Sequence, residues 1–255
     1  MKPEKRQNEI LSILRAMQRE FRVEELTRML GVSSLTVRRD LQKLSDVKAI
    51  IRTHGGCLAA GRVSLETEYY KKVALNFELK QAIGRTAAQQ VSSGEIILIN
   101  DGSTTYHLAA HLGGLGALTV YTNSIAMISE LSRHKNIRQY ILGGEYNPEL
   151  HSLSGSLAEH MLELVHFDRV FLGVDAIDDE GRCMVGTLAE ARLTQLMLRS
   201  GTMKILLADH TKCGAVSHVA YGTLQDFDLW ITTPGMKDEE REKYREKTQI
   251  MEAAV

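Results

Sequence analysis

Apolar residues recur at helical spacing in three short runs within the first sixty residues. The first run consists of Ile10, Ile13, Leu14 and Met17, and the second covers residues 23–30. In the third run, Val37, Leu41 and Leu44 lie at i, i+4 and i+7 and therefore share one helix face. Gly31, between the second and third runs, favours the left-handed conformation that ends a helix. The pattern predicts amphipathic helices, of which the second and third are joined by a tight turn.

The third predicted helix carries hydroxyl, amide and cationic side chains away from its apolar face. Ser33 or Ser34 is placed to cap it. Such a helix after a short turn has the layout of a DNA-reading helix-turn-helix. The predicted DNA-contacting residues are Ser33, Ser34, Thr36, Arg38, Arg39, Gln42 and Lys43. An alternative interpretation is a small helical interaction module whose basic face is merely solvated.

Residues 49–58 form two short strand-like segments around Gly55 and Gly56, a pattern that predicts a β-hairpin. Beside a helix-turn-helix, such a hairpin would be a wing. Arg52 and His54 would then contact the DNA backbone or the minor groove. Residues 1–60 are therefore predicted to be a winged helix-turn-helix DNA-binding domain.

Beyond a predicted linker at 61–75, short apolar runs alternate with helical stretches. Apolar runs of this length are typical of buried parallel strands, and helical crossovers between them predict a doubly wound α/β domain over 76–255. The predicted strands lie at 96–99, 118–121, 137–142, 169–172, 204–207 and 229–231. The predicted helices lie at 77–91, 105–112, 125–133, 156–164, 188–200 and 237–247.

Charge divides the chain in the same way. The first 60 residues carry 12 Lys and Arg and 7 Asp and Glu, a net charge of +5, whereas the rest carries 19 basic and 25 acidic residues, a net charge of −6. A basic head favours the phosphate backbone of DNA, and an acidic body requires a different partner. No apolar run reaches the roughly 18 residues needed to span a bilayer. We therefore expect a cytoplasmic protein with no membrane partner.

The loops after the predicted strands are rich in hydroxyl, glycine and carboxylate residues. In a doubly wound sheet, ligands bind beyond the carboxyl ends of the strands. Hydroxyls and helix N-termini bind anions, Lys212 adds a positive charge, and carboxylates suit sugar hydroxyls. The predicted effector-binding residues are Asp101, Ser103, Thr104, Thr105, Thr122, Asn123, Ser124, Gly143, Gly144, Asp175, Glu190 and Lys212. Each loop alone is also an ordinary turn. Together they predict a site for a phosphorylated sugar or polyol.

Cysteine and histidine spacing favours no metal or redox chemistry. Cys57, Cys183 and Cys213 form no CxxC pair. His107 and His111 have the i, i+4 spacing of metal ligands, but no third ligand accompanies them. We expect no metal site and no cofactor.

The N-terminal segment resembles the DeoR family of bacterial transcriptional regulators. The residues that carry the resemblance are, in order, Arg6, Ile10, Leu14, Ser33, Thr36-Val37-Arg38-Arg39-Asp40-Leu41 and Arg52-Thr53-His54-Gly55-Gly56. Two positions depart from the family pattern. The turn at 19–21 is one residue longer than usual, and Lys48 replaces a common glycine. Neither departure removes a DNA-facing residue.

The rest of the chain resembles the DeoR-type effector domain, which is itself similar in fold to ribose-5-phosphate isomerase. The residues that carry this resemblance include Lys80, Asp101-Gly102-Ser103-Thr104-Thr105, Thr122-Asn123-Ser124, Gly143-Gly144, Ser154-Gly155, Asp168, Gly181, Glu190-Ala191 and the segments 171–177 and 209–214. Ala176 departs from the glycine that many members have there. The resemblance implies a sugar-phosphate inducer and an oligomeric repressor of a sugar or polyol catabolic operon.

An isomerase acting on a phosphosugar, fused to a DNA-binding head, is the alternative interpretation. Isomerisation needs a base that moves a proton between adjacent carbons, and Asp175, Asp178 and Glu190 are suitable carboxylates. No lysine near them is placed to stabilise an enediolate, because the segment 181–187 offers only Arg182. The sequence therefore favours ligand binding without turnover, and we expect no enzymatic activity.

Overall fold

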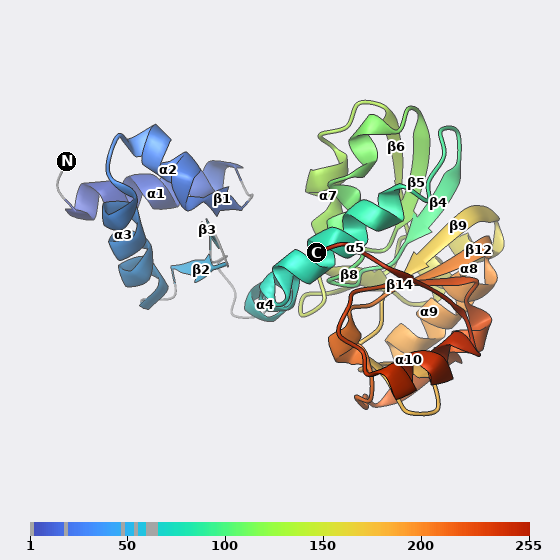
Figure 1. The fold of residues 1–255 in the computed structure, drawn as a ribbon. Coiled ribbons are helices and arrows are strands. Elements are labelled where there is room, and N and C mark those ends of the chain that lie inside the picture. The colour runs from blue at the N-terminus through green and yellow to red at the C-terminus, as the bar shows by residue number, and fades with distance from the viewer. Residues whose placement is uncertain (1–2, 18–19, 47–48, 54–55, 60–65) are drawn as a thin grey trace. The chain divides into compact units, whose positions relative to one another are not determined.

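The chain divides into two units, Met1–Leu75 and Asn76–Val255, and each is described by itself. A computed structural model describes residues 3–17, 20–46, 49–53, 56–59 and 66–255. Figure 1 shows helices beside a small sheet in the first unit and a larger α/β fold in the second. The stretch predicted as a linker carries a helix, α4 (Glu66–Ala74), at the end of the first unit.

The N-terminal unit contains the predicted helix-turn-helix. Its helices are α1 (Pro3–Met17), α2 (Val23–Leu30) and α3 (Ser34–Asp46). Gly31 ends α2 with φ 65°, and its N–H donates to the carbonyl oxygen of Thr27 at 3.0 Å. This left-handed conformation favours glycine, as the sequence predicted. The buried apolar side chains that join the helices are Ile10, Leu14, Val23, Leu26, Val37, Leu41 and Leu44.

A small antiparallel sheet accompanies these helices, in the order β1 (Phe21–Arg22), β3 (Gly56–Ala59), β2 (Ile50–Arg52). The β2–β3 pair is the predicted wing hairpin. Strand β1 was not predicted, because two residues show no periodicity. A Cβ at Gly56 would lie 2.0 Å from the carbonyl oxygen of Phe21. Glycine is therefore required where β1 meets the wing.

A buried polar contact joins α1 to α3. The guanidinium of Arg6 forms an ion pair with Asp40, and Gln7 Nε2 donates to Asp40 Oδ1 at 2.9 Å. Only 4% of the Asp40 side chain is exposed. Because Asp40 belongs to the helix predicted to read DNA, this contact sets how that helix lies against α1.

A parallel sheet forms the centre of the second unit, with the described strands in the order β15-β14-β12-β9-β4-β5-β6. From β4 the chain adds β5 and β6 on one side and then returns to β4 with β9 on the other. The sheet is therefore doubly wound, with its switch point between β4 and β9. The strands are β4 (Ile96–Ile99), β5 (Leu118–Thr122), β6 (Ile137–Ile141), β9 (Phe167–Leu172), β12 (Gly201–Leu207), β14 (Leu229–Thr232) and β15 (Gln249–Glu252). All but β15 were predicted. That strand lies at the sheet edge, and its terminal residues are polar and exposed.

Helices cover both faces of this sheet (Figure 1). One apolar core joins the sheet to α5 (Phe77–Ala88), α6 (Tyr106–Ala109) and α7 (Ile125–Leu131). A second core joins it to α8 (Ser156–Glu163), α9 (Leu188–Arg199) and α10 (Asp238–Arg245). These helices match the predicted ones, including the mixed-charge helix near the chain end. Among the helices of the described residues, none is long and apolar enough to cross a membrane.

Several short elements of the second unit were not predicted. Their strands pair in a hairpin and in a small antiparallel sheet outside the main one. The hairpin consists of β7 (Glu145–Asn147) and β8 (Ser152–Ser154), and the small sheet of β10 (Ala176–Ile177), β11 (Arg182–Val185) and β13 (Val219–Thr223). The short 3-10 helices are η1 (Leu112–Gly114), η2 (His210–Lys212) and η3 (Leu224–Asp226).

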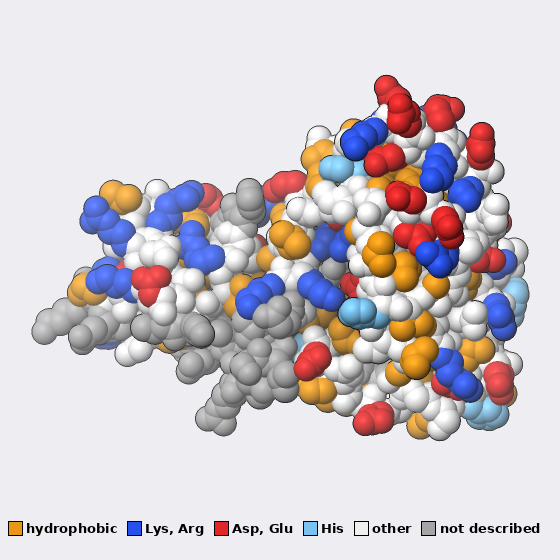
Figure 2. Space-filling view, turned by 90° about the horizontal axis from the view of Figure 1, so that it is seen from below, with side chains coloured by type: hydrophobic (Ala, Val, Ile, Leu, Met, Phe, Trp, Pro, Cys, Tyr) orange, Lys and Arg blue, Asp and Glu red, His pale blue; other side chains and the backbone are white. Residues whose placement is uncertain are grey.

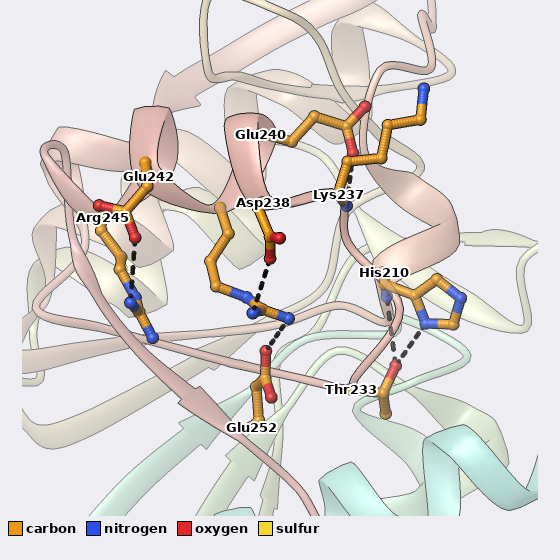
Figure 3. Close-up of polar contacts among 9 residues, drawn as sticks. His210, Thr233, Lys237, Asp238, Glu240, Glu242, Arg245 and Glu252 are labelled. Carbon is orange, nitrogen blue, oxygen red and sulfur yellow. Dashed lines mark hydrogen bonds and ion pairs between the residues drawn. The ribbon is translucent and has the colours of Figure 1, made fainter.

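Polar contacts hold the last helix and the loop after β12 in place (Figure 3). Arg241 Nη2 lies 3.0 Å from Glu252 Oε1 and joins α10 to β15. His210 Nδ1 lies 2.9 Å from Thr233 Oγ1, directly after β14. The second contact ties η2, which carries Lys212, to the carboxyl end of the sheet.

Candidate functional site

The cationic side chains of α3 lie away from its buried face. Arg38, Arg39 and Lys43 are exposed, whereas Val37 and Leu41 are fully buried. Ser33, Ser34, Leu35 and Gln42 are exposed as well. Figure 2 shows Lys and Arg side chains gathered on the N-terminal unit. The predicted reading face is thus accessible to a polyanion.

Ser33 caps the start of α3. The N–H of Thr36 donates to Ser33 Oγ at 3.3 Å, and the two hydroxyl oxygens are 2.9 Å apart. The structure thereby decides between the two serines that the sequence allowed as the cap. Ser34 is the exposed first residue of the helix. Hydroxyls and amides at a helix start are suited to a phosphate group.

Arg52 of the wing is only half-exposed. Its Nη1 is buried and has no hydrogen-bond partner among the described residues. Arg52 pairs with Cys57 across the hairpin. Burial raises the pKa of the Cys57 thiol to about 12, although the Arg52 charge acts in the opposite direction. Part of the Arg52 head therefore faces the protein, and its predicted DNA contact stays a prediction. His54 lies outside the described residues.

A pocket lies at the switch point of the larger sheet. It is bounded by the loops after β4 and β5, the β7–β8 hairpin and the start of α9. Its described lining residues are Asp101, Asn123, Asn147, Leu150, Ser152, Ser154, Thr187, Ala189, Glu190, Leu193 and Thr194. Three of the predicted effector residues, Asp101, Asn123 and Glu190, are among them. The lining from the hairpin was missed, because its three-residue strands carry no periodic signal.

The carboxyl group of Asp101 has a raised pKa. Burial is the main cause, and the charge of Asp175 adds to it. Hydrogen bonds from the side chains of Ser152 and Asn123 act in the opposite direction but do not cancel it. The hairpin residue Ser152 thereby meets the loop after β4.

The carboxylates of Asp175 and Glu190 flank Gly186. A Cβ at Gly186 would lie 3.3 Å from Glu190 Oε2 and 3.9 Å from Asp175 Oδ2. Thr187 caps α9, accepting from the N–H of Glu190 at 3.3 Å and donating to Glu190 Oε2 at 2.8 Å. The helix start thus holds the Glu190 carboxylate in position. Together with Asp101, these side chains form an acidic cluster at the switch point.

Asn123 offers a further hydrogen-bond acceptor to the pocket. It is 3% exposed, and its Nδ2 donates to the carbonyl oxygen of Leu153 at 3.3 Å. Its Oδ1 is buried without a hydrogen-bond partner among the described residues. Buried polar atoms are nearly always hydrogen-bonded, so this oxygen is suited to a donor on a ligand.

A buried lysine adjoins the same loop. Lys80 of α5 is 2% exposed, and its Nζ donates to Ser103 Oγ at 3.0 Å. Buried lysines are rare. Lys80 carries part of the family resemblance but was not among the predicted effector-binding residues. A lone lysine in a helical stretch gives no local signal that it contacts a loop 23 residues away.

Other predicted hydroxyl residues hold the loops in shape. Thr105 Oγ1 lies 2.8 Å from the carbonyl oxygens of Asn100 and Gly102. Thr122 Oγ1 accepts from the N–H of Ser124 at 3.0 Å. Thr104, Thr105, Thr122 and Ser124 are all buried, and none is among the described lining residues of the pocket.

The predicted glycines and Lys212 also lie outside that lining. Gly144 has φ 140°, and a Cβ there would lie 2.1 Å from the carbonyl oxygen of Ser154. It therefore allows close packing of the hairpin.

The half-buried Lys212 follows Thr211, whose Oγ1 accepts from Asn76 Nδ2 at 3.1 Å. This contact places η2 beside the start of α5, the helix that carries Lys80. At Gly143, the residue before Gly144, a Cβ would lie 3.0 Å from Leu157 Cδ2.

The two histidines with metal-ligand spacing share one glutamine. Gln81 Nε2 lies 3.0 Å from His107 Nδ1, and Gln81 Oε1 lies 3.0 Å from His111 Nε2. Gln81 thus joins α5 to the segment that carries both rings. The described residues contain no group of three or more His, Cys, Asp or Glu side chains arranged to hold a metal.

Solved structures are similar to part of the chain. Ribose-5-phosphate isomerase A of Methanocaldococcus jannaschii is 16% identical with a TM-score of 0.40, and the match covers 54% of this chain and 55% of that one. The translation factor eIF2B beta of Chaetomium thermophilum is 14% identical with a TM-score of 0.45, covering 67% and 54%. In both cases the match covers little more than half of the other chain.

Comparison with protein families covers both units. The DeoR-like helix-turn-helix domain matches residues 6–62, and the DeoR C terminal sensor domain matches residues 75–233. The chain is 34% identical to the HTH-type transcriptional regulator GlpR of Haloferax volcanii, over 87% of this chain and 86% of that protein. It is 33% identical to the HTH-type transcriptional repressor GlcR of Bacillus subtilis, over 88% and 86%. The chain belongs to the DeoR family of transcriptional regulators.

Proposed function

We propose that the protein represses a sugar or polyol catabolic operon in the cytoplasm and leaves its operator when a phosphorylated sugar binds. The observation that carries the proposal is the pairing of two sites in one chain. An exposed basic helix, α3, suits DNA, and a pocket at the switch point of an acidic α/β unit suits a small polar ligand. The GlcR relative is named as a repressor.

On the DNA side, Arg38, Arg39 and Thr36 read base edges in the major groove. Ser34 and Arg52 hold phosphates. Reading helices of this kind usually act in pairs, so the working form is a homo-oligomer on an operator with repeated half-sites.

On the ligand side, the phosphate group binds at the loop after β4. Ser103 and Lys80 meet there at 3.0 Å, and a buried ammonium group gives a charge-assisted hydrogen bond to a phosphate oxygen. Lys212 approaches from η2. The sugar hydroxyls bind to Asp101, Asn123 and Glu190, which line the pocket.

Release of DNA requires that the ligand bind the DNA-incompetent state more tightly than the DNA-bound state. A ligand with equal affinity for both states would shift nothing, however tightly it bound. The loops after β4 and β12 meet the start of α5 through Lys80 and Asn76. Ligand contacts to these loops are therefore passed to a helix near the N-terminal end of the unit.

Gel-shift titrations at fixed salt test both halves of the proposal. Replacing Arg39 by Ala should weaken operator binding by about 1–3 kcal/mol, the usual value of one base contact. Gly186→Ala should keep operator affinity but lose release by sugar phosphates, because its methyl group would lie between Asp175 and Glu190. The matched controls are Lys243→Ala, on α10, and Gly114→Ala, where a Cβ meets nothing within 4 Å. Normal release of the Gly186→Ala variant would refute the pocket assignment.

We propose ligand binding without turnover rather than the isomerase alternative. Asp175 and Glu190 lie together, as a proton-shuttling pair would. However, the described lining of the pocket contains no Lys or Arg to stabilise an enediolate. Arg182 is 53% exposed and pairs with Asp178 at 2.6 Å. Analysis of the products after incubation with pentose and hexose phosphates tests this choice, and any aldose–ketose conversion would favour the enzyme.

A further inference from the structure

Charge is unevenly distributed along the loop after β4. Asp101 lies with Glu190 in the pocket lining, and the charge of Asp175 acts on Asp101. None of the described lining residues is Lys, Arg or His. Lys80 instead meets this loop at Ser103, two positions along the chain from Asp101. The site therefore has a cationic end and an acidic end.

The two ends lie close together. Two residues of extended chain span at most about 7 Å. This limit on the separation of Asp101 and Ser103 is comparable to the length of a sugar chain of a few carbons. A ligand whose phosphate lies near Ser103 would therefore place its other end at the carboxylates.

The acidic end presents mainly hydrogen-bond acceptors. Ionised carboxylates only accept. Asn123 is only 3% exposed, and its Oδ1 has no hydrogen-bond partner among the described residues. Thr187 already donates its hydroxyl to Glu190 at 2.8 Å. A ligand atom placed against Asn123 Oδ1 must donate a hydrogen bond.

We propose that the pocket selects phosphorylated polyols and neutral sugars and rejects phosphorylated sugar acids of the same length. A ligand carboxylate would face Asp101, Asp175 and Glu190 without a basic side chain in the described lining. Like charges repel strongly in a partly buried site. Hydroxyl or amino groups satisfy the same acceptors. The inference rests on the proposed function, since it concerns the ligand of that site.

The test compares pairs of phosphates that differ only at the far end. Suitable pairs are glycerol 3-phosphate with 3-phosphoglycerate, ribitol 5-phosphate with 5-phosphoribonate, and glucitol 6-phosphate with 6-phosphogluconate. Binding to the full-length protein is measured by calorimetry at pH 8, where the carboxylates of the ligands are ionised. At least one neutral member should bind, and its acid partner should bind at least tenfold more weakly.

A charge-neutral variant sharpens the comparison. Glu190→Gln keeps the helix cap with Thr187. It should reduce the preference for the neutral member about tenfold, whereas Glu239→Gln, on the exposed start of α10, should leave it unchanged. Acids that bind wild type as tightly as their neutral partners would overturn the charge inference alone. If neither member of any pair binds, the proposed response to sugar phosphates fails, and this inference fails with it.

Discussion

At the residue scale, Asp101 and Asp178 show how two carboxyls of one unit acquire opposite properties. Burial, reinforced by Asp175, raises the pKa of Asp101. Burial also raises the pKa of Asp178, but hydrogen bonds from Arg182 and from the backbone of Glu180 outweigh it and leave that pKa lowered. The fold therefore disfavours the ionised form of Asp101 and favours the ionised form of Asp178. A costly carboxylate in a pocket is typical of a functional position.

The two positions should respond oppositely to neutralisation. Asp101→Asn should raise the melting temperature at neutral pH, because it removes a carboxylate whose folded-state pKa lies above its unfolded value. That gain should vanish once pH falls below the unfolded pKa, where the wild-type carboxyl is protonated in both states. Asp178→Asn should lower the melting temperature at neutral pH, and this loss should shrink as pH falls through the unfolded pKa and then the lowered folded one. Thermal melts between pH 3 and 8 measure both, and equal shifts of the same sign would contradict the assignment.

At the element scale, the orientation of α3 depends on a polar contact rather than on apolar packing alone. Arg6 and Gln7 of α1 both bind Asp40, which lies beside the buried stripe formed by Val37 and Leu41. Apolar contacts alone tolerate small rotations, whereas a hydrogen-bonded ion pair has one geometry. The contact therefore suits a helix whose opposite face is proposed to match DNA.

Removing one partner of this buried pair should be costly. Asp40→Ala should destabilise the N-terminal unit by about 3–5 kcal/mol, because it breaks a buried ion pair and removes the carboxylate that binds both Arg6 and Gln7. The expected result is faster amide hydrogen exchange in α1 and α3 of the full chain, with exchange in α9 unchanged. The control is Asp46→Ala, at the exposed end of α3, where one hydrogen bond within the described residues is lost, that from Gln42 at 2.8 Å. Unchanged exchange in α1 of the Asp40→Ala variant would show that the pair contributes little.

At the scale of the whole molecule, the proposed switch is a coupling between two binding equilibria. Linkage requires the coupling to be reciprocal. If a sugar phosphate weakens operator binding by some factor, saturating operator must weaken binding of that sugar phosphate by the same factor. Allosteric couplings typically amount to roughly 5–150-fold.

The coupling is tested by measuring how much sugar phosphate weakens operator binding and how much operator weakens sugar-phosphate binding. We expect fluorescence titrations of operator, with and without sugar phosphate, to agree with titrations of sugar phosphate, with and without operator. A duplex of unrelated sequence at the same salt is the control, because it carries the charge of DNA without the specific contacts. Unequal factors would mean that the two titrations do not follow the same molecular species, for example because the oligomeric state differs between them.

The local sequence pattern determined the elements and their order. Helices such as α3 and buried strands such as β4 follow from periodic apolar residues, which each segment carries in itself. The prediction that the loops after the strands form one site follows from the same pattern, since parallel strands place their carboxyl ends on one edge of the sheet. The short strands β1, β7 and β10 escaped prediction because two or three residues have no period.

Only the tertiary structure decided which of the predicted residues meet. Lys80 contacts Ser103, Ser152 reaches Asp101, and Gly186 separates Asp175 from Glu190, all through packing of segments far apart in the chain. The same packing placed Thr105 within its own loop rather than in the pocket lining. Sequence specifies which groups a loop carries, because composition is local. The direction and burial of each group depend on what the rest of the fold packs against it.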